Sequence, residues 1–439
     1  MASIFKAYDI RGVYGDTLDE KLAKNIGRAF VTFLKCKKVV VGRDMRPHSG
    51  PLFDALAEGI TMQGADIVDL GLCTSPMSYY ANGTLGADAG IMITASHNPG
   101  EWNGFKLSRE KAIPISGVTG IADIEKIILD EAYDAPAETP GTISKQGVID
   151  EYCAHVREMA DLARPVKIVA DMANAMGVLE AEAFDGIIEI DPLFNQLDGS
   201  FPNHEANPLD HETLVDLQKR VKESDCDFGI AFDGDADRCG FVDENGDIVP
   251  MDLITALVAE DLLSKEKGVI FYDLRSSWAV KEIIEENGGT PMMSRVGHAF
   301  IKEQMRDNNA IFAGELSGHY YFRDNFFTES SSMAAICVAN IVSKSDKPLS
   351  ELVKPIKKYF ASGEINSTVK DTGVIFERLK KDYSDGNVFE LDGVSVEYDE
   401  WWFNVRASNT EPLMRLNVEA KTQELMEQKR DEVLAFIRS

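Results

Sequence analysis

Three stretches of the chain repeat one pattern, and this repetition limits the fold more than any other feature of the sequence. In each stretch an apolar strand ends in a polar loop, a helical period follows, and a glycine often marks the return to a second strand. The stretches begin at Lys38, Val166 and Gly268. Strands that alternate with helices form βαβ units, which need parallel strands covered by helices. We therefore expect an α/β protein with three related domains built on mixed, mainly parallel sheets.

The pattern changes after Ser362-Gly363. Short runs that alternate like strands follow, and a charged helical segment closes the chain. Earlier, residues 134–147 are rich in Pro, Gly, Thr and Ala, as in a connector, and Asn245-Gly246 is a strong hairpin signal. These breaks predict four domains, at residues 1–150, 151–250, 251–362 and 363–439, of which the last is a smaller α+β domain.

The charge of the chain excludes two classes of partner. Its 439 residues contain 45 Lys+Arg and 73 Asp+Glu, a formal net charge of −28. Nucleic acids and anionic membranes are bound largely through neutralising Lys and Arg, so we expect neither as a partner. The six cysteines are dispersed without C-x-x-C pairs, and no apolar run is long enough for a membrane span. We expect a cytoplasmic protein that binds a small molecule; the sequence does not indicate its oligomeric state.

The first polar loop is TASHNP at residues 94–99, which follows an apolar strand. Ligands of open α/β sheets bind beyond the carboxyl ends of the strands, so Ser96 and His97 are well placed for chemistry. Ser96 is the candidate nucleophile or phosphate carrier, although a Ser/Asn turn closed by proline also explains the motif. No G-x-S-x-G elbow is present, which argues against a serine hydrolase. Lys106 lies on the next expected strand, where a desolvated amine can serve as an acid or base.

The second loop is DGDADR at residues 233–238, again after an apolar strand. Its alternate aspartates can converge on one hard cation, because oxygen ligands suit Mg²⁺ or Ca²⁺. The spacing also fits an EF-hand, but Arg238 stands where that loop needs glycine, and strands flank it instead of helices. A solvated acidic turn remains the alternative. Arg238 has a use here if a phosphate bridges to the metal.

The third loop is GELSGH at residues 314–319. If this segment is extended, Glu315, Ser317 and His319 point the same way. The carboxylate can then accept hydrogen bonds from two adjacent sugar hydroxyls while His319 reaches the reacting centre. A glycine-flanked turn with a surface histidine is the alternative. His298, which precedes a helical run, carries the same two interpretations.

The fourth loop is RASNTEP at residues 406–412, with Arg415 beyond it. Hydroxyls, an amide and flanking guanidiniums are what a phosphate monoester needs, and arginine can bind it bidentately. Ser408 and Glu411 also have the spacing of a helix capping box. The residues that follow alternate like a strand, so we prefer a phosphate-binding loop between two strands.

Taken in this order, the four motifs resemble the α-D-phosphohexomutase family, and specifically its phosphomannomutase and phosphoglucomutase branch. The likeness spans nearly the whole chain and includes KAYDIRG at residues 6–12 and VGHAFIKE around His298. That family has three related α/β domains and a smaller fourth, in agreement with the organisation expected above. The resemblance assigns the phosphoserine, metal-binding, sugar-binding and phosphate-binding loops to the four predicted domains in turn.

The resemblance also implies a role for each matching residue. The expected Mg²⁺ ligands are the phosphorylated Ser96, Asp233, Asp235 and Asp237. Sugar hydroxyls are expected to contact Glu315 and Ser317. The clamp on the non-reacting phosphate is expected to comprise Arg406, Ser408, Asn409, Thr410 and Arg415. The catalytic group around the transferring phosphoryl group is expected to comprise Ser96, Arg11, Lys106, His97, Arg238, His298 and His319.

The implied reaction interconverts hexose 6-phosphate and hexose 1-phosphate, with mannose as the main sugar and glucose as a second. Hexose 1,6-bisphosphate is the implied intermediate and activator. Phosphoryl transfer depends mostly on positioning and charge stabilisation. Three aspartates, a phosphoserine of about −2 and one Mg²⁺ leave roughly −3 at the site, which Arg11, Lys106 and Arg238 can offset. The clamp must accept either phosphate, which favours a mobile final domain.

The sequence departs from the family pattern at two places. Ala236 stands where many members have glycine, so we expect this residue to avoid positive φ. Asn409 stands where the glucosamine-phosphate branch usually has glycine, which disfavours an amino-sugar substrate. Two other functions stay open: a metal-dependent sugar-phosphate phosphatase that uses Ser96 and the aspartates, and a Ca²⁺-binding structural protein built on the Asp233 loop.

Overall fold

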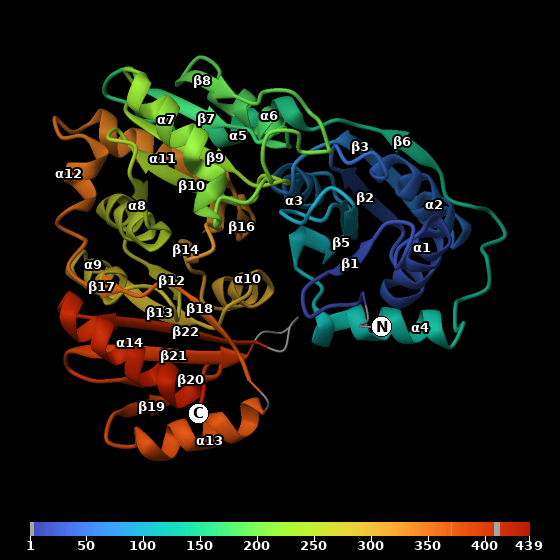
Figure 1. Cartoon of the computed structure of the whole chain (residues 1–439). Helices are drawn as coiled ribbons and strands as arrows, with labels where there is room; N and C mark the ends of the chain where they lie inside the picture. Colours follow the sequence, from blue (N-terminus) through green and yellow to red (C-terminus); the bar gives the residue numbers. More distant parts are fainter. Residues whose placement is uncertain (1–3, 370, 408–412) are drawn as a thin grey trace.

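The computed structural model describes residues 4–369, 371–407 and 413–439 (Figure 1). Four sheets define four domains along the chain. The first domain lies on the right of Figure 1, the second and third lie on the left, and the C-terminal domain lies below the third. This arrangement confirms the predicted fold class, three α/β domains followed by a smaller α+β domain.

The first domain contains a six-stranded sheet in the order β1-β5-β4-β2-β3-β6. Its strands are β1 (Ile10–Val13), β2 (Lys38–Arg43), β3 (Asp66–Leu72), β4 (Ala89–Ile93), β5 (Trp102–Arg109) and β6 (Ile143–Lys145). Its helices are α1 (Glu20–Leu34), α2 (Ser49–Met62), α3 (Ser75–Thr84) and α4 (Ala122–Leu129). Strand β5 runs antiparallel to both neighbours, whereas β4, β2, β3 and β6 are parallel.

The second domain has the strand order β11-β10-β9-β7-β8. Its strands are β7 (Lys167–Asp171), β8 (Glu189–Leu193), β9 (Phe228–Phe232), β10 (Cys239–Asp243) and β11 (Ile248–Val249), and its helices are α5 (Ile149–Arg157), α6 (Gly177–Glu180) and α7 (Val215–Glu223). Every residue of β9 is buried, which explains its continuous apolar sequence. The predicted hairpin at Asn245-Gly246 joins β10 and β11, with Gly246 at a φ of 77°.

The third domain has the strand order β13-β12-β14-β15-β16. Its strands are β12 (Val269–Asp273), β13 (Thr290–Ser294), β14 (Phe312–Gly314), β15 (Tyr320–Phe322) and β16 (Thr328–Glu329). Its helices are α8 (Met251–Lys265), α9 (Trp278–Glu286), α10 (His298–Asp307), α11 (Ser331–Ser343) and α12 (Leu349–Val353). Helices α8 and α11 are apolar on most sides because both lie inside the molecule.

The three α/β sheets are repeats of one topology. Each repeat consists of four strands. Within the sheet, the fourth strand of the repeat lies at one side, followed by the third, the first and the second. Of these four strands, only the fourth runs antiparallel to the strand beside it. The first repeat therefore reads β5-β4-β2-β3, the second β10-β9-β7-β8 and the third β15-β14-β12-β13. This order confirms the structural repeat predicted from the alternation of strands and helices.

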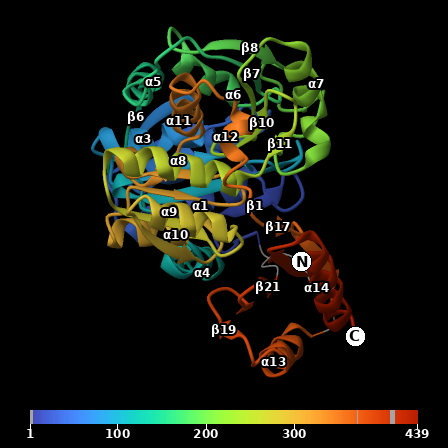
Figure 2. The same cartoon turned by 90° about the vertical axis from the view of Figure 1, so that its left-hand side faces the viewer.

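The C-terminal domain is an antiparallel sheet covered by two helices. Its strands are β17 (Phe360–Ala361), β18 (Ile365–Thr368), β19 (Asn387–Phe389), β20 (Val394–Glu397), β21 (Trp401–Ala407) and β22 (Leu413–Ala420), and its helices are α13 (Thr372–Asp382) and α14 (Gln423–Ile437). The order is β17-β22-β21-β20-β19, with β18 also on β22. In Figure 2 this domain projects away from the body that the other three form.

The apolar cores follow from local sequence patterns. Val39 and Val41 of β2 face a cluster under α1 and α2, whereas Val40 points to the opposite face and joins a core shared by the first three domains. Polar side chains cap the helix starts: Asp19 accepts from the N–H of Leu22, and Thr74 from that of Met77. Among the described residues, no helix has both the length and the hydropathy that crossing a membrane requires.

Candidate active site

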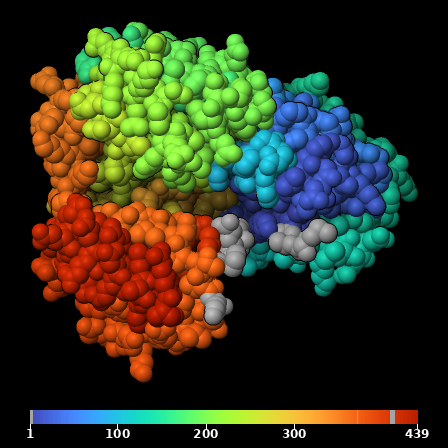
Figure 3. All heavy atoms as spheres, viewed as in Figure 1, coloured from blue at the N-terminus to red at the C-terminus, as the bar shows by residue number. Residues whose placement is uncertain are grey.

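The first three motif loops occupy the same position in the three repeats. TASHNP follows β4, DGDADR follows β9 and GELSGH begins at the end of β14, so each connects the third strand of its sheet to the antiparallel fourth. The three sheets turn these edges towards one another, and the surface is hollowed where the domains meet (Figure 3). Equivalent loops of three repeats therefore build one site.

Ser96 is buried and held in a constrained conformation. Its φ is 53°, in the left-handed region that non-glycine residues adopt at some cost. The Ser96 N–H donates to Thr94 Oγ1 at 2.9 Å, and its carbonyl accepts from Arg46 Nη2 at 2.9 Å. The Ser96 hydroxyl donates to Asp233 Oδ2 at 2.9 Å and lies 3.3 Å from His97 Nδ1. A serine oxygen of the first domain thus faces the acidic loop of the second.

The acidic loop packs tightly against the Ser96 loop. A Cβ at Gly234 would lie 2.1 Å from the carbonyl oxygen of Ser96, so only glycine fits at this position. The expectation for Ala236 is wrong: its φ is 60°, in the left-handed region. The conformation is stabilised because the Ala236 N–H donates to the carbonyl of Asp233 and its own carbonyl accepts from Ser331 Oγ. Contacts from the third domain therefore offset the cost of a positive φ at this alanine.

Three buried carboxylates form a group that fits a divalent cation. Asp233, Asp235 and Asp237 each offer an oxygen, and these oxygens lie within 4.8 Å of one another. Within the described part of the chain, Oδ1 of Asp235 is buried without a hydrogen-bond donor, and Oδ1 of Asp237 lies 3.4 Å from His319 Nε2. Burial and the charges of its two neighbours raise the pKa of Asp233 to about 7. A hard cation would relieve this repulsion, and an all-oxygen donor set suits Mg²⁺.

A second acidic group beside the first is already neutralised. Asp237, His319 and Glu329 also lie close enough to share an ion. However, the buried ammonium of Lys302 is 2.6 Å from Glu329 Oε2, so a cationic side chain already compensates that carboxylate. The three aspartates fit Mg²⁺ better, because all of their donor atoms are oxygens, whereas the second group includes the imidazole of His319.

Lys106 connects the metal-binding candidate to the first domain. Its ammonium, on β5, donates to Oδ2 of Asp235 and of Asp237. Although burial alone would lower it, these two carboxylates raise the pKa of Lys106 well above its usual value. Ser75, at the start of α3, also contacts the loop: its hydroxyl donates to Asp235 Oδ2 and its N–H to the Asp235 carbonyl. Both residues of the first domain fix the loop of the second.

The third loop is a turn rather than the extended segment considered above, because the Gly318 N–H donates to the Glu315 carbonyl at 3.0 Å. The turn still gathers the predicted side chains. His319 Nδ1 lies 3.1 Å from Glu315 Oε2 and 2.9 Å from Ser317 Oγ, and His319 Nε2 lies 3.4 Å from Asp237 Oδ1 and 3.1 Å from Arg238 Nε. The second and third loops are therefore in direct contact.

The electrostatic surroundings separate the three histidines. Burial and Arg238 oppose protonation of His319, but Asp237 and Glu315 outweigh them and raise its pKa to about 9. Burial and neighbouring cations lower the pKa of His97 and of His298 well below the ordinary value. These surroundings therefore favour the charged form of His319 and the neutral forms of His97 and His298.

Arg11 and Tyr8 bring the amino-terminal segment to the site. Arg11 Nε donates to Asp9 at 2.8 Å, and Arg11 Nη1 donates to Asn98 at the end of the Ser96 loop. The Tyr8 hydroxyl donates to the carbonyl of Val296, and its ring lies 5.7 Å from that of His298. The segment therefore joins the first and third domains.

The fourth loop lies partly outside the described residues. Ser408, Asn409 and Thr410 belong to that part, so their predicted contacts stay predictions. Arg406 on β21 and Arg415 on β22 are described and are cross-strand partners. Their guanidiniums lie 2.8 and 3.3 Å from the two oxygens of Glu364. Two predicted clamp arginines thus meet at a carboxylate that sequence reasoning did not single out.

Other residues of the site were also missed from the sequence. Arg46 is buried and donates to four carbonyls of the Ser96 loop, those of Ser96, Asn98, Pro99 and Trp102. Arg275, which follows β12, pairs with Asp273 at 2.7 Å. Each of these arginines follows a strand of a repeat. They could have been identified from the sequence as charged residues at the carboxyl end of a strand, where ligands of such sheets bind.

Comparisons with known proteins agree along the whole chain. Phosphoglucomutase/phosphomannomutase profiles match alpha/beta/alpha domains I, II and III at residues 2–134, 150–246 and 250–359, and the C-terminal domain at 353–436. A phosphomannomutase of Escherichia coli is 42% identical, with 99% of both chains covered. A phosphomannomutase of Methanocaldococcus jannaschii is 41% identical, covering 99% of this chain and 97% of the relative. The crystal structure of a phosphoglucomutase/phosphomannomutase family protein from Burkholderia thailandensis gives a TM-score of 0.92 at 34% identity, covering 99% and 97%.

Proposed function

The chain belongs to the phosphoglucomutase/phosphomannomutase family and is a hexose-phosphate mutase, and from this premise we propose that it interconverts mannose 6-phosphate and mannose 1-phosphate through a phosphorylated Ser96. The observation that carries the proposal is the contact between Ser96 Oγ and Asp233 Oδ2 at 2.9 Å. It brings a hydroxyl able to carry a phosphoryl group to a buried group of three carboxylates. Glucose phosphate is the second substrate that we propose.

Asp233, Asp235 and Asp237 would hold Mg²⁺ together with an oxygen of phosphorylated Ser96. The bound ion would supply charge stabilisation to the transferring phosphoryl group. Arg11, Lys106 and Arg238 surround the same loops and would offset the remaining negative charge. This local positive charge is needed because a second phosphate must enter a protein of net charge −28.

The first transfer would break the bond between phosphorus and the Ser96 oxygen and form one to a sugar hydroxyl oxygen. The second would break the bond between phosphorus and the other phosphorylated sugar oxygen and form one to the Ser96 oxygen. The sugar hydroxyl loses a proton in the first transfer, and a group of the site must take it; in the reverse direction a group must return it. Lys106, His298 and His319 are the candidates for these proton transfers. His319 contacts Asp237 and Arg238, and its ring lies 6.4 Å from that of His298, so both imidazoles lie beside the acidic loop.

The first transfer would produce hexose 1,6-bisphosphate, which must present its other phosphate to Ser96 before the second transfer. Glu315 and Ser317 would hold the sugar hydroxyls in both orientations. Arg406, Arg415 and the loop of Ser408, Asn409 and Thr410 would bind the phosphate that does not react. We further propose that the C-terminal domain closes over the substrate and opens for the turn of the bisphosphate.

Two observations support the finer parts of the proposal. The relatives named phosphomannomutase are 41–42% identical over 99% of this chain, which supports mannose as the main sugar. All six cysteines are free thiols, which supports a reducing compartment, and we propose the cytoplasm. A phosphatase and a Ca²⁺-binding structural protein, the alternatives raised from the sequence, are not favoured by the family.

The decisive experiment compares kcat/KM for mannose 1-phosphate and glucose 1-phosphate in the wild type and in Ser96→Ala. We expect a loss of at least about a thousandfold on both sugars, since the group that carries the phosphoryl is gone. Ser144→Ala on the exposed strand β6 is the matched control and should keep full activity. Substantial isomerisation by Ser96→Ala would refute a covalent phosphoenzyme, and a higher kcat/KM for glucose 1-phosphate would refute mannose as the main sugar.

A further inference from the structure

Glu364 lies in the short segment that connects the third domain to the clamp. It stands between β17 and β18, the first two strands of the C-terminal sheet, and its side chain is 25% exposed. The next residue, Ile365, begins β18, which pairs with β22 and so lies beside Arg415. This position gives one side chain access to both the clamp and the neighbouring domain.

The carboxylate of Glu364 is shared by three guanidiniums. Oε2 accepts a hydrogen bond from Arg406 Nη2 at 2.8 Å and lies 3.6 Å from Arg275 Nη1. Oε1 lies 3.3 Å from Arg415 Nη1. Burial alone would raise the pKa of Glu364, but Arg406, Arg275 and Arg415 lower it below the usual value. The group is therefore ionised at neutral pH and binds all three cations.

The two clamp arginines need a negative partner to lie where they do. Arg406 and Arg415 are direct cross-strand partners on β21 and β22, and like charges in such a pair repel each other. The side chain of Arg406 is only 5% exposed, so water screens this repulsion poorly. Its Nε and that of Arg415 are buried without an acceptor in the described part of the chain. Glu364 thus neutralises the pair while leaving donors for a ligand.

Glu364 also links the clamp to the sugar-binding loop. Arg275, its third partner, pairs with the fully buried Asp273, and Asp273 Oδ2 accepts a hydrogen bond from the N–H of Leu316 at 2.8 Å. Leu316 lies between Glu315 and Ser317, the two residues proposed to hold the sugar. A continuous polar path therefore runs from the sugar-binding loop through Asp273, Arg275 and Glu364 to the clamp.

We propose that Glu364 is a positioning residue that fixes the guanidiniums of Arg406 and Arg415 for the non-reacting phosphate and aligns them with the sugar-binding loop. The proposal rests on the proposed function, because it takes those arginines as the phosphate clamp. Arginine binds a phosphate strongly only when its planar fork is held in register with two oxygens. Glu364 provides this orientation before the substrate arrives.

In the alternative role, Glu364 occupies the clamp and competes with phosphate. This role predicts the opposite change in phosphate affinity when Glu364 is replaced. Removal of a competing carboxylate would strengthen phosphate binding. The arrangement favours the positioning role, because three arginines share the single negative charge of Glu364. Net positive charge therefore remains to bind a phosphate dianion.

The experiment compares the wild type with Glu364→Gln and Glu364→Asp, using mannose 1-phosphate as substrate and inorganic phosphate as a competitive inhibitor. For Glu364→Gln we expect KM and the inhibition constant of phosphate to rise about tenfold, with kcat changed less than about threefold, since binding is lost equally in the ground and transition states. Glu364→Asp keeps the charge and should recover part of the affinity. Thermal unfolding checks that each variant is folded.

Glu266→Gln is the matched control. Glu266 forms a two-point pair with Arg323 at 2.7 Å on the surface of the third domain, far in sequence from the clamp, and its loss should leave KM unchanged. An unchanged or lower KM in Glu364→Gln, or a fall in kcat alone, would overturn the positioning role. A wild type without mutase activity would refute the proposed function instead, so the two failures are distinguishable.

Discussion

The contact of the first three domains differs in kind from the contact between the third domain and the C-terminal domain. The first three share one apolar core, which runs from Val40 to Ile356, whereas the C-terminal domain has a core of its own, from Ile375 to Ile437. Hydrogen bonds also join the three motif loops of the first group directly. The proposed chemical centre is therefore built into a single packed body.

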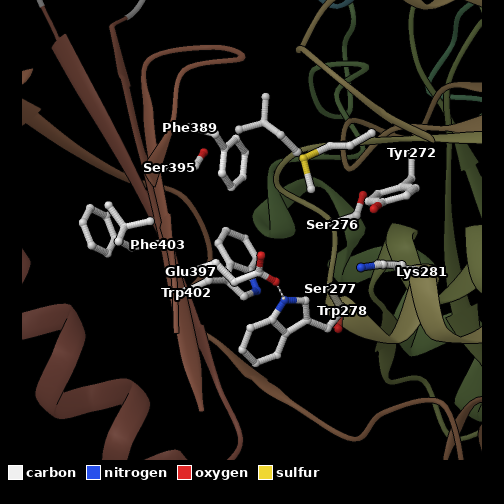
Figure 4. Close-up of a pocket in the computed structure, with 13 residues that line it drawn as sticks. Tyr272, Ser276, Ser277, Trp278, Lys281, Phe389, Ser395, Glu397, Trp402 and Phe403 are labelled. Carbon is white, nitrogen blue, oxygen red and sulfur yellow. Dashed lines mark hydrogen bonds between the residues drawn. The ribbon is translucent and has the colours of Figure 1, made fainter. Parts of the chain in front are cut away.

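The interface with the C-terminal domain combines hydrogen bonds with aromatic side chains and is incompletely filled. A cavity of about 60 Å³ lies between the end of β12 and the C-terminal sheet. Tyr272, Trp278, Lys281, Glu397 and Trp402 are among the residues that line it (Figure 4). The indole N–H of Trp278 donates to Glu397 across it, and the backbone N–H of Trp278 donates to Glu419. The unfilled volume shows that the two domains pack less tightly here than the first three domains, which share one core.

The comparison suggests that the buried centre and the C-terminal clamp have different functions. A centre that stabilises phosphoryl transfer gains from rigid, buried charges, because they need no reorganisation during the reaction. A clamp that must accept either phosphate of a bisphosphate gains from a domain that can move. Variants of the buried centre should therefore reduce kcat most, and variants of the clamp should affect KM.

After Ser96→Ala, the largest effect is expected for Asp235→Asn in the buried centre. Loss of one carboxylate weakens the cation site and removes a partner of Lys106, so kcat/KM at fixed Mg²⁺ should fall at least about a hundredfold. Steady-state assays across a Mg²⁺ series measure this. Asp191→Asn, which weakens contacts with Arg220 and Ser224 outside the proposed site, is the control. Equal activity of Asp235→Asn and the wild type at low Mg²⁺ would remove the aspartates from the metal site.

A smaller effect, and of a different kind, is expected for Arg406→Lys in the clamp. Lysine keeps the charge but loses the planar fork, so KM should rise about tenfold or more while kcat changes less. Arg220→Lys on the surface of the second domain is the matched control. A fall in kcat as large as that of Asp235→Asn would break the proposed division between the two regions.

The interface itself should respond to pH through Glu419. Burial raises the pKa of Glu419 to about 7 from an ordinary 4.5, so the folded protein binds its proton more tightly than the unfolded chain does. The wild type should therefore lose up to about 3 kcal/mol of stability as pH rises from 4.5 to above 7. Glu419→Gln should remove most of this slope.

Melting temperatures at pH 5 and pH 8 test the prediction for Glu419, with Glu286→Gln on the exposed side of α9 as control. If the melting temperature depended on pH in the same way in the wild type and in Glu419→Gln, proton binding by Glu419 would not contribute to stability.

The smallest expected change is a compaction on ligand binding. Small-angle scattering of Ser96→Ala, which cannot turn the ligand over, should give a lower radius of gyration with hexose 1,6-bisphosphate than without it. Domain closure brings the clamp nearer the other three domains and so shortens the molecule. An identical scattering curve with saturating ligand would rule out domain closure. The two regions would then differ in their chemical roles and not in their mobility.

Much of the fold could be predicted from the sequence because its signals are local. The apolar run of β9, the Asn245-Gly246 hairpin and the strand before Ser96 each depend on neighbouring residues. The motif loops could be found for the same reason. The turn at Glu315 was harder to predict, because a short segment flanked by glycines fits both a strand and a turn.

The sequence by itself determined the order of the strands and helices, the three repeats and the side chains offered at each loop. Only the tertiary structure decided which loops meet, why Ala236 adopts a positive φ, and that Arg46 and Glu364 hold their respective loops. These features depend on partners far away in the chain, such as Ser331 for Ala236 and Arg406 for Glu364. A carboxylate or guanidinium acquires its role from the charges packed around it, and folding alone brings those charges together.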